Sequence, residues 1–299
     1  MADIIEGRAI AAELRASLKD EVEMLHRQTG KRPGLAVVLV GDDSASEVYV
    51  RMKRKACNET GIESIDHNYG KDYGHDNLIR LVKELNSDPS VNGILVQLPL
   101  PDGYDEKEVI NTISPEKDID GFHPINVGRM VTGDPDCFLP CTPAGCQEMI
   151  RRVVPDLKGK HVVIVGRSNI VGKPLANMML QKNETANCVV TVCHSAAPDI
   201  SVFTKQADIL VAAAGVPGLI TGEMVKEGAV VIDVGTNRVK DPADNSVKPK
   251  LVGDVDFESV SRVAYAITPV PGGVGPMTIT MLLKNTVKAF RLQNNLSGK

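Results

Sequence analysis

Short apolar runs alternate with amphipathic stretches along the first half of the chain. Residues 35–40 are apolar throughout and are followed by Gly41, which is typical of a strand buried on both faces of a sheet. The stretch 44–60 predicts a helix with Ser44 or Ser46 as its N-terminal cap. A strand, a helix and a second buried strand are predicted next, near 62–67, 76–86 and 91–101. This alternation predicts a parallel sheet with helices on both faces.

The second half repeats the pattern more regularly. Four short apolar strands are predicted, at 161–166, 188–193, 209–215 and 229–235, with helical segments between them. Each ends in glycine or a small polar residue, where a doubly wound sheet places its ligand crevice. The segment 140–143, Pro-Cys-Thr-Pro, is expected to join the two halves. The fold class is therefore α/β, with a Rossmann-like parallel sheet in the second half.

The composition narrows the class of protein. Of 299 residues 42% are hydrophobic and 24% charged, and the net charge of −4 argues against a nucleic-acid-binding protein. The acidic start, Met1 to Glu6, differs from the basic start of a targeting leader, and no apolar run is long enough to span a membrane. We therefore expect a cytoplasmic protein. Cys137, Cys141 and Cys146 match no common zinc spacing, so we expect buried thiols and no metal.

A loop rich in proline and glycine lies near the C-terminus. Three prolines and three glycines fall within 267–276, so we expect neither a helix nor a central strand there, and a helix beginning near Thr280. Glycine lets a ligand approach the main chain, and a following helix offers free N–H groups. The alternative is a tight connector between a strand and a helix.

The turn Gly166 to Gly172 follows the first strand of the second half, where a dinucleotide phosphate would bind. Ser168 replaces the middle glycine of the usual motif, so the motif alone is weak. The second strand ends in His194 and Ser195, with no acid to hold a ribose 2′-hydroxyl. Arg167, Ser168 and Ser195 instead suit a 2′-phosphate, which favours NADP over NAD. His194 is a secondary contact or a turn residue.

Candidate chemistry in the first half centres on Lys53. Tyr49 and Lys53 are four residues apart on a predicted helix and share one face, although the basic run around Lys53 is also typical of a solvated surface. Gln97 interrupts an apolar strand and needs a hydrogen-bond partner. Asp118 and Asp120 precede a glycine and could act in a site or form an Asx-type turn.

Taken together, these motifs resemble one known family. The motifs occur in this order: Ser46-x-x-Tyr49-x3-Lys53, Val96-Gln97-Leu98-Pro99, Lys117-Asp118-Ile119-Asp120-Gly121, Gly166-Arg167-Ser168-x-Ile170-Val171-Gly172-x-Pro174, and Pro269 to Thr278. The series resembles the bifunctional methylenetetrahydrofolate dehydrogenase/methenyltetrahydrofolate cyclohydrolase family, from about Ile5 to the final helix. Thr236 departs from the family pattern, which has a more apolar residue near the nicotinamide.

The resemblance implies a folate site in the cleft between two domains. It implies a catalytic domain at 1–142 completed by a C-terminal helix at 279–299, and an NADP domain at 143–278. Lys53 would be catalytic, Gln97 would contact it, Tyr49 would stack on the folate and Asp120 would anchor the pterin. The implied folate contacts are Tyr49, Val50, Arg51, Met52, Lys53, Val96, Gln97, Leu98, Asp120, Pro271, Gly272, Gly273, Val274, Gly275, Pro276, Met277, Thr278 and Ile279. The implied NADP contacts are Gly166, Arg167, Ser168, His194, Ser195 and Thr236.

The activities implied are NADP-dependent oxidation of 5,10-methylenetetrahydrofolate and hydrolysis of the methenyl product to 10-formyltetrahydrofolate. The family implies a homodimer formed through the cofactor domain, and a folate substrate that can be polyglutamylated. Two other interpretations remain open: an NADP-dependent dehydrogenase of a small hydroxy or amino acid, and a cofactor-sensing binding protein. The first gives Gln97 no role, and the second gives no reason to keep Tyr49, Lys53, Gln97 and Asp120 together.

Overall fold

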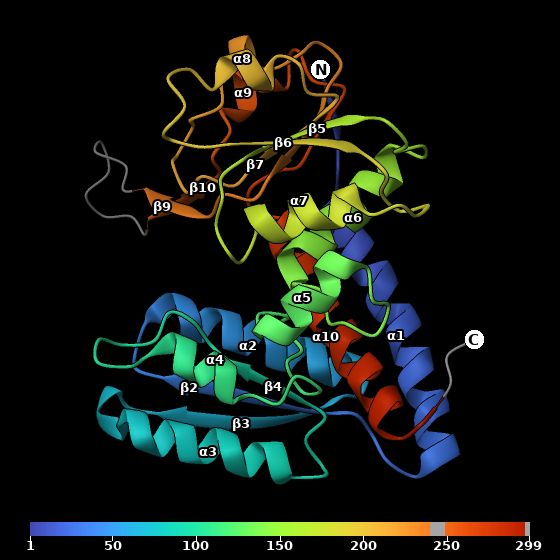
Figure 1. Ribbon diagram of the computed structural model, residues 1–299, viewed down its shortest axis with the longest axis vertical. Coiled ribbons are helices and arrows are strands. Elements are labelled where there is room, and N and C mark those ends of the chain that lie inside the picture. Colours follow the sequence, from blue (N-terminus) through green and yellow to red (C-terminus); the bar gives the residue numbers. More distant parts are fainter. Residues whose placement is uncertain (240–248, 297–299) are drawn as a thin grey trace. The chain divides into compact units, whose positions relative to one another are not determined.

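The computed structural model describes residues 1–239 and 249–296 (Figure 1). The chain forms two compact units, each made of discontinuous segments. Unit 1 comprises residues 1–11 and 142–278, and unit 2 comprises 12–141 and the chain from Ile279 onward. The expected α/β class is confirmed in both, because each unit contains a parallel sheet with helices packed against it.

Unit 2 is built on a three-stranded parallel sheet in the order β3-β2-β4. The strands are β2 (Gly34–Val40), β3 (Glu63–Tyr69) and β4 (Gly93–Val96), close to the predicted ranges. Every residue of β2 is buried, as its continuous apolar run requires. One face of β2 and β4 packs on α3 (His75–Ser87) and α4 (Glu106–Thr112), and α3 runs along the sheet (Figure 1).

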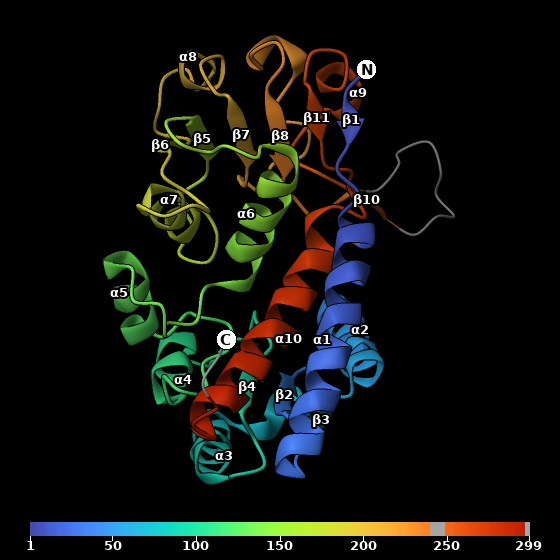
Figure 2. The ribbon, with the colours of Figure 1, turned by 90° about the vertical axis from the view of Figure 1, so that its right-hand side faces the viewer.

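Two long helices contribute most of their residues to unit 2. They are α1 (Gly7–Thr29) and α10 (Val274–Gln293), which lie side by side in both views (Figures 1 and 2). Within unit 2, Arg15 donates to Thr280 Oγ1 at 3.1 Å, and Arg291 pairs with Glu21. The remaining elements are α2 (Ser44–Thr60), α5 (Pro124–Thr132) and the short 3₁₀ turn η1 (Lys71–Tyr73).

Unit 1 contains a six-stranded parallel sheet in the order β1-β11-β8-β7-β5-β6 (Figure 2). The strands are β1 (Asp3–Ile4), β5 (His161–Val165), β6 (Val189–Cys193), β7 (Ile209–Ala212), β8 (Val230–Asp233) and β11 (Ala266–Ile267). The helical segments are α6 (Cys141–Val153), α7 (Gly172–Leu180), α8 (Ser201–Thr204), η2 (Gly222–Met224) and α9 (Phe257–Val260). A separate antiparallel pair joins β9 (Asn237–Val239) to β10 (Lys250–Val252). This is the predicted Rossmann-like arrangement.

The compact units differ from the predicted domain bounds at the N-terminus. Residues 1–11 belong to unit 1, because β1 pairs in parallel with β11 and adds a strand to that sheet. A two-residue strand has no periodicity from which it could be recognised, so only its partner reveals it.

Two helix starts also differ from prediction. Asp43, rather than Ser44 or Ser46, caps α2: its carboxylate accepts from the Ser46 N–H at 2.8 Å. Helix α10 begins at Val274, inside the Pro/Gly loop, rather than near Thr280. Pro276 falls in its first turn, where proline is tolerated because that turn's N–H groups have no helical partner.

The cysteines are unpaired and buried, as expected: Cys57, Cys137, Cys141, Cys146, Cys188 and Cys193. The predicted linker at 140–143 contains the start of α6, and the boundary between the units falls between Cys141 and Thr142. No helix in the described part of the chain combines the length and the apolar character needed to span a membrane.

Candidate active site

Helix α2 carries the main candidate of unit 2. It follows the carboxyl end of β2, and its 3.6-residue repeat places Tyr49 and Lys53 on one face. Lys53 is only 7% exposed, whereas Arg51 and Met52 are exposed and Val50 is buried. The basic run is therefore a solvated surface except at Lys53. Burial lowers the pKa of the Lys53 amine, and the Asp120 carboxylate opposes that effect.

Gln97 has the hydrogen-bond partners that a polar side chain in an apolar strand needs. It follows β4, and its backbone N–H donates to the Val38 carbonyl, which brings it beside the end of β2. Its Nε2 donates to the Leu98 carbonyl at 2.8 Å, and its Oε1 accepts from Lys53 Nζ at 2.8 Å. Because both ends of the amide are engaged, its orientation is fixed. Val96 is buried, and Leu98 is partly exposed beside it.

The two acids of the Asp-Ile-Asp motif have different roles. Asp118 is 2% exposed and accepts from the Phe122 and His123 N–H groups and from Asn126 Nδ2, at 2.9–3.2 Å. It holds the turn before α5, so the Asx-type interpretation applies to this residue. Asp120 instead faces Lys53, and burial raises its pKa to about 6.

Cys141 completes this cluster, and local sequence reasoning does not find it. Its thiol donates to the Ile119 carbonyl at 3.3 Å and lies beside the Asp120 carboxyl. Burial raises the pKa of the thiol well above its usual value, so it stays protonated at neutral pH. The spacing of the cysteines can only indicate a metal site. It gives no indication of a contact between Cys141 and Asp120.

In unit 1, the turn after β5 has the form of a phosphate cradle. Gly166 has a φ of +127°, which disfavours other residues, and a Cβ on Gly172 would lie 2.2 Å from the Gly166 carbonyl oxygen. The Ser168 hydroxyl accepts from the Val171 N–H at 3.1 Å and so shapes the entry to α7. Arg167 and Ser168 are exposed. A bare turn at a helix N-terminus with a free cation fits an anionic cofactor.

The end of β6 lies next to this turn. Gly166 N donates to the Cys193 carbonyl at 2.8 Å, so residues after Cys193 follow beside those after Val165. Ser195 is exposed. His194 Nδ1 accepts from the Ala196 N–H at 3.2 Å, so this imidazole also shapes its own turn. Thr236 is exposed after β8, two strands along the sheet from β5.

The Pro/Gly loop is tightly fixed within unit 1. Its Gly272 carbonyl accepts from the Arg8 N–H at 3.0 Å, and a Cβ on Gly7 would lie 1.9 Å from the Gly273 oxygen. Thr278 and Thr142 hydrogen-bond through their hydroxyls at 3.0 Å. The loop therefore has the defined shape that its composition predicts.

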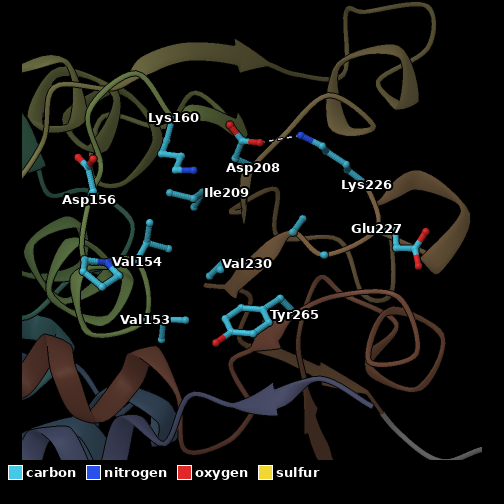
Figure 3. A pocket seen from close by; sticks show the side chains of 13 residues that line it. Val153, Val154, Asp156, Lys160, Asp208, Ile209, Lys226, Glu227, Val230 and Tyr265 are labelled. Carbon is cyan, nitrogen blue, oxygen red and sulfur yellow. Dashed lines mark hydrogen bonds and ion pairs between the residues drawn. The ribbon is translucent and has the colours of Figure 1, made fainter.

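A cavity of about 530 Å³ lies elsewhere in unit 1. Its lining includes Lys160, Ile209 and Val230, which lie at the amino ends of β5, β7 and β8 (Figure 3). Lys226 Nζ pairs there with Asp208 Oδ1 at 2.6 Å. Ligands of doubly wound sheets bind at the carboxyl ends of the strands, so this cavity is not the expected cofactor crevice.

Comparison with known proteins identifies the family. A model described as the catalytic domain of tetrahydrofolate dehydrogenase/cyclohydrolase matches residues 5–120, and the NAD(P)-binding domain of the same family matches 140–294. The chain belongs to this family. The Bifunctional protein FolD of Chlorobium phaeobacteroides is 56% identical over 294 residues, which cover 98% of this chain and 99% of that protein.

Solved structures of family members have the same fold over nearly the whole chain. The FolD dehydrogenase/cyclohydrolase of Campylobacter jejuni is 46% identical with a TM-score of 0.90 and covers 99% of both chains. The Trypanosoma brucei enzyme is 41% identical with a TM-score of 0.91, covering 97% of this chain and 98% of its own, and was solved with NADP cofactor and an inhibitor. The resemblance to the tetrahydrofolate dehydrogenase/cyclohydrolase family is confirmed, and neither rival interpretation predicts both family domains in one chain.

The structure brings together Lys53, Gln97 and Asp120 in unit 2, and the turns bearing Arg167 and Ser195 in unit 1. Besides Cys141, sequence reasoning misses Asp233 and Asp254 at the carboxyl end of the unit 1 sheet. Asp233 carries a weak signal, since it is a charged residue that ends an apolar strand. Asp254 carries none.

Proposed function

We propose that Lys53, Gln97 and Asp120 carry the folate chemistry of this bifunctional enzyme. The enzyme oxidises 5,10-methylenetetrahydrofolate to 5,10-methenyltetrahydrofolate with NADP and hydrolyses that product to 10-formyltetrahydrofolate. The observation that supports these roles is the buried Lys53 amine, 2.8 Å from Gln97 Oε1 and close to the Asp120 carboxyl.

Hydrolysis of the methenyl cation needs a group that takes a proton from the attacking water. Lys53 is suited to this because burial lowers its pKa and increases the fraction of neutral amine. Gln97 Nε2 is already donating to Leu98, so Oε1 must accept an N–H of the amine. That hydrogen bond turns the nitrogen lone pair away from Gln97 and leaves it available as a base.

Asp120 is proposed to anchor the pterin. With a pKa of about 6 it is mostly ionised at neutral pH, so its two oxygens can accept from an amino group and an adjacent ring N–H. Its charge also lies near Lys53, where it stabilises a protonated amine after proton transfer. We further propose that Tyr49 stacks on the folate and that the segment 271–279 contacts it.

The turn after β5 is proposed to hold the cofactor. Bound there, NADP supplies the acceptor for the hydride that leaves the one-carbon bridge. Arg167 and Ser168 are exposed at the cradle, and Ser195 lies on the neighbouring turn, so the three can face a 2′-phosphate together. Hydride transfer moves no proton to the protein, so the requirement on these residues is alignment.

A cytoplasmic homodimer formed through unit 1 is the proposed physical state. Strand β6 is an edge of the six-stranded sheet, and it exposes Val189 by 57% and Val192 by 39%. An exposed apolar edge strand favours pairing with another copy. Light scattering of the wild type and of Val189→Lys tests this proposal, because a charge at the edge should shift the mass to that of a monomer.

One assay tests the activities. Purified protein is given 5,10-methylenetetrahydrofolate and NADP, and the absorbance of NADPH and of the methenyl product is followed. The expected result is formation of both, followed by loss of the methenyl absorbance as hydrolysis proceeds. NADPH formation with a small hydroxy acid, and none with the folate, would support the rival dehydrogenase.

A further inference from the structure

Two buried carboxylates interlock at the carboxyl end of the unit 1 sheet. Asp233 is the last residue of β8 and is 4% exposed, and Asp254 is fully buried. Asp233 Oδ1 accepts from the N–H groups of Gly235 and Asp254, each at 2.9 Å. Its Oδ2 accepts from Val255 N at 3.0 Å. Asp233 therefore fixes the main chain at Asp254.

Asp254 in turn holds two further segments. Its Oδ2 accepts from the N–H groups of Ala214 and Gly215 at 2.6 and 2.8 Å, in the loop that follows β7. Its Oδ1 accepts from Asn237 Nδ2 at 2.8 Å, just beyond Thr236. One carboxylate thus joins the loops after β7 and β8. We call Asp233 and Asp254 together the aspartate clasp.

The aspartate clasp is tightly packed. A Cβ on Gly253 would lie 1.7 Å from Asp233 Oδ2, and a Cβ on Gly235 would lie 2.3 Å from Asp254 Oδ1. Asp233 therefore packs against Gly253, which precedes Asp254. Asp254 packs against Gly235, two residues after Asp233. Three N–H donors on each carboxylate compensate for the loss of water around buried charge.

Strand order decides which half of a dinucleotide these loops face. The order is β8-β7-β5-β6, and the phosphate cradle follows β5. The proposed 2′-phosphate contacts, Arg167 and Ser195, lie at the ends of β5 and β6, so the adenosine half takes that side. The other half of a molecule that straddles the cradle must then extend over the ends of β7 and β8.

We propose that Asp254, anchored by Asp233, is a positioning residue for the nicotinamide half of NADP. It fixes the loops after β7 and β8 so that the nicotinamide binds in one defined position. It does not contribute to binding of the adenosine half. This inference rests on the proposed cofactor site. The protein also offers an internal control, because hydrolysis of methenyltetrahydrofolate consumes no NADP.

The test compares Asp254→Ala with Asp254→Asn. Alanine removes the acceptors of all three N–H groups. Asparagine can present its oxygen to Ala214 and Gly215 and its amide nitrogen to Asn237, whose own amide can turn to accept. In the alanine variant kcat of the dehydrogenase should fall about 10- to 100-fold, since small misplacements of a reacting group carry costs of that order. The asparagine variant should stay within about threefold of wild type.

Two binding measurements separate positioning from general damage. For Asp254→Ala the Kd for 2′,5′-ADP, which carries only the adenosine half, should stay within about threefold of wild type, and methenyl hydrolysis should be unchanged. Hydrogen exchange of the Ala214 and Gly215 amides should speed up in the alanine variant and not in the asparagine variant. If the alanine variant does not fold, Asn237→Ala removes one donor to the clasp and should give the same pattern more weakly.

The outcomes are distinct. Unchanged dehydrogenase kinetics in Asp254→Ala, or loss of 2′,5′-ADP binding equal to the loss of kcat, would overturn the positioning role. A wild-type protein that binds neither NADP nor 2′,5′-ADP would instead overturn the proposed cofactor site, while the exchange of the two amides would still report on the clasp.

Discussion

Lys53 Nζ and Gln97 Oε1 lie 2.8 Å apart, although 44 positions separate the two residues in the chain. The contact exists because β4 pairs with β2 and α2 follows β2, which brings a strand end and a helix face together. A buried amine differs from a surface lysine in having a lowered pKa. Its one fixed hydrogen bond also sets the orientation of the amine. The relationship makes the role of each residue testable through the other.

Replacing Gln97 by alanine should slow methenyl hydrolysis about 10-fold, because one hydrogen bond to the base is worth about 1 kcal/mol or slightly more. In a Lys53→Met background the same change should have little further effect, since Gln97 acts through the amine. Steady-state hydrolysis rates of the four proteins give the coupling. Strict additivity of the two losses would mean that Gln97 contacts the substrate independently.

Lys53→Met keeps most of the side-chain volume and removes the amine. Hydrolysis should fall by about 10²–10⁴-fold, the usual contribution of a general base, whereas hydride transfer should remain measurable. Lys55→Met is the matched control, because that side chain is 80% exposed on the same helix, and its activities should equal wild type. A Lys53→Met enzyme that hydrolyses methenyltetrahydrofolate normally would remove Lys53 from the mechanism.

Asp120→Asn keeps the shape of the side chain and puts a donor where the pterin needs an acceptor. The KM for the folate should rise by about 100-fold, as expected for losing charge-assisted hydrogen bonds. The Kd for NADP, measured by fluorescence titration, should not change. Normal folate binding would show that the pterin is held elsewhere; Asp118 is not a ready substitute, since its oxygens already accept three bonds.

Arg167→Ala should weaken the binding of NADP by about 2 kcal/mol, which is roughly a 30-fold rise in Kd. The binding of NAD should weaken much less, because only NADP carries the 2′-phosphate. Lys173→Ala is a matched control: that cation is also exposed near the turn, but it is engaged with Asn169 Oδ1 at 2.7 Å. Equal losses for the two cofactors would assign Arg167 to the shared pyrophosphate or to the fold.

Stability should depend on pH through two acids whose pKa is raised in the folded state. Burial raises the pKa of Asp120 and of Asp233 to about 6 in the folded state. Between about pH 4 and pH 6 the folded protein then holds more protons than the unfolded chain, so the unfolding free energy falls as pH rises through that window, by up to about 3 kcal/mol per group. Urea titrations at pH 5 and pH 7 should show a smaller fall for Asp120→Asn. An equal fall in both proteins would contradict the assignment.

The sequence predicts the sheets well because their strands are short, apolar and bounded. Strand β5 is recognisable from its unbroken apolar run before Gly166, and β2 from the run before Gly41. Strands β1 and β11 are not recognisable, since two residues carry no pattern; β1 is defined by its pairing with β11, and β11 by its pairing with β1 and β8. The N-cap Asp43 is missed because Asp42, Asp43 and Ser44 are consecutive polar residues, and each is a suitable N-cap.

The site is predictable only where a residue contradicts its surroundings. Gln97 stands out as a polar residue in an apolar strand, and its partner is confirmed as Lys53. Asp118 and Asp120 look alike in sequence, and only the structure separates the turn-forming acid from the one that faces the amine. Cys141 and Asp254 belong to long-range contacts that leave no local trace.

The discontinuous make-up of the two units constrains how the chain can fold during synthesis. Strand β1 pairs with β11, whose residues emerge from the ribosome on the order of tens of seconds later at about 5–20 residues per second. Unit 2 likewise lacks the α10 segment beginning at Ile279 until nearly the whole chain has been made. Both units should therefore reach their native state late and almost together, and a nascent chain released near residue 141 should be a substrate for chaperones and proteases rather than an independent catalytic domain.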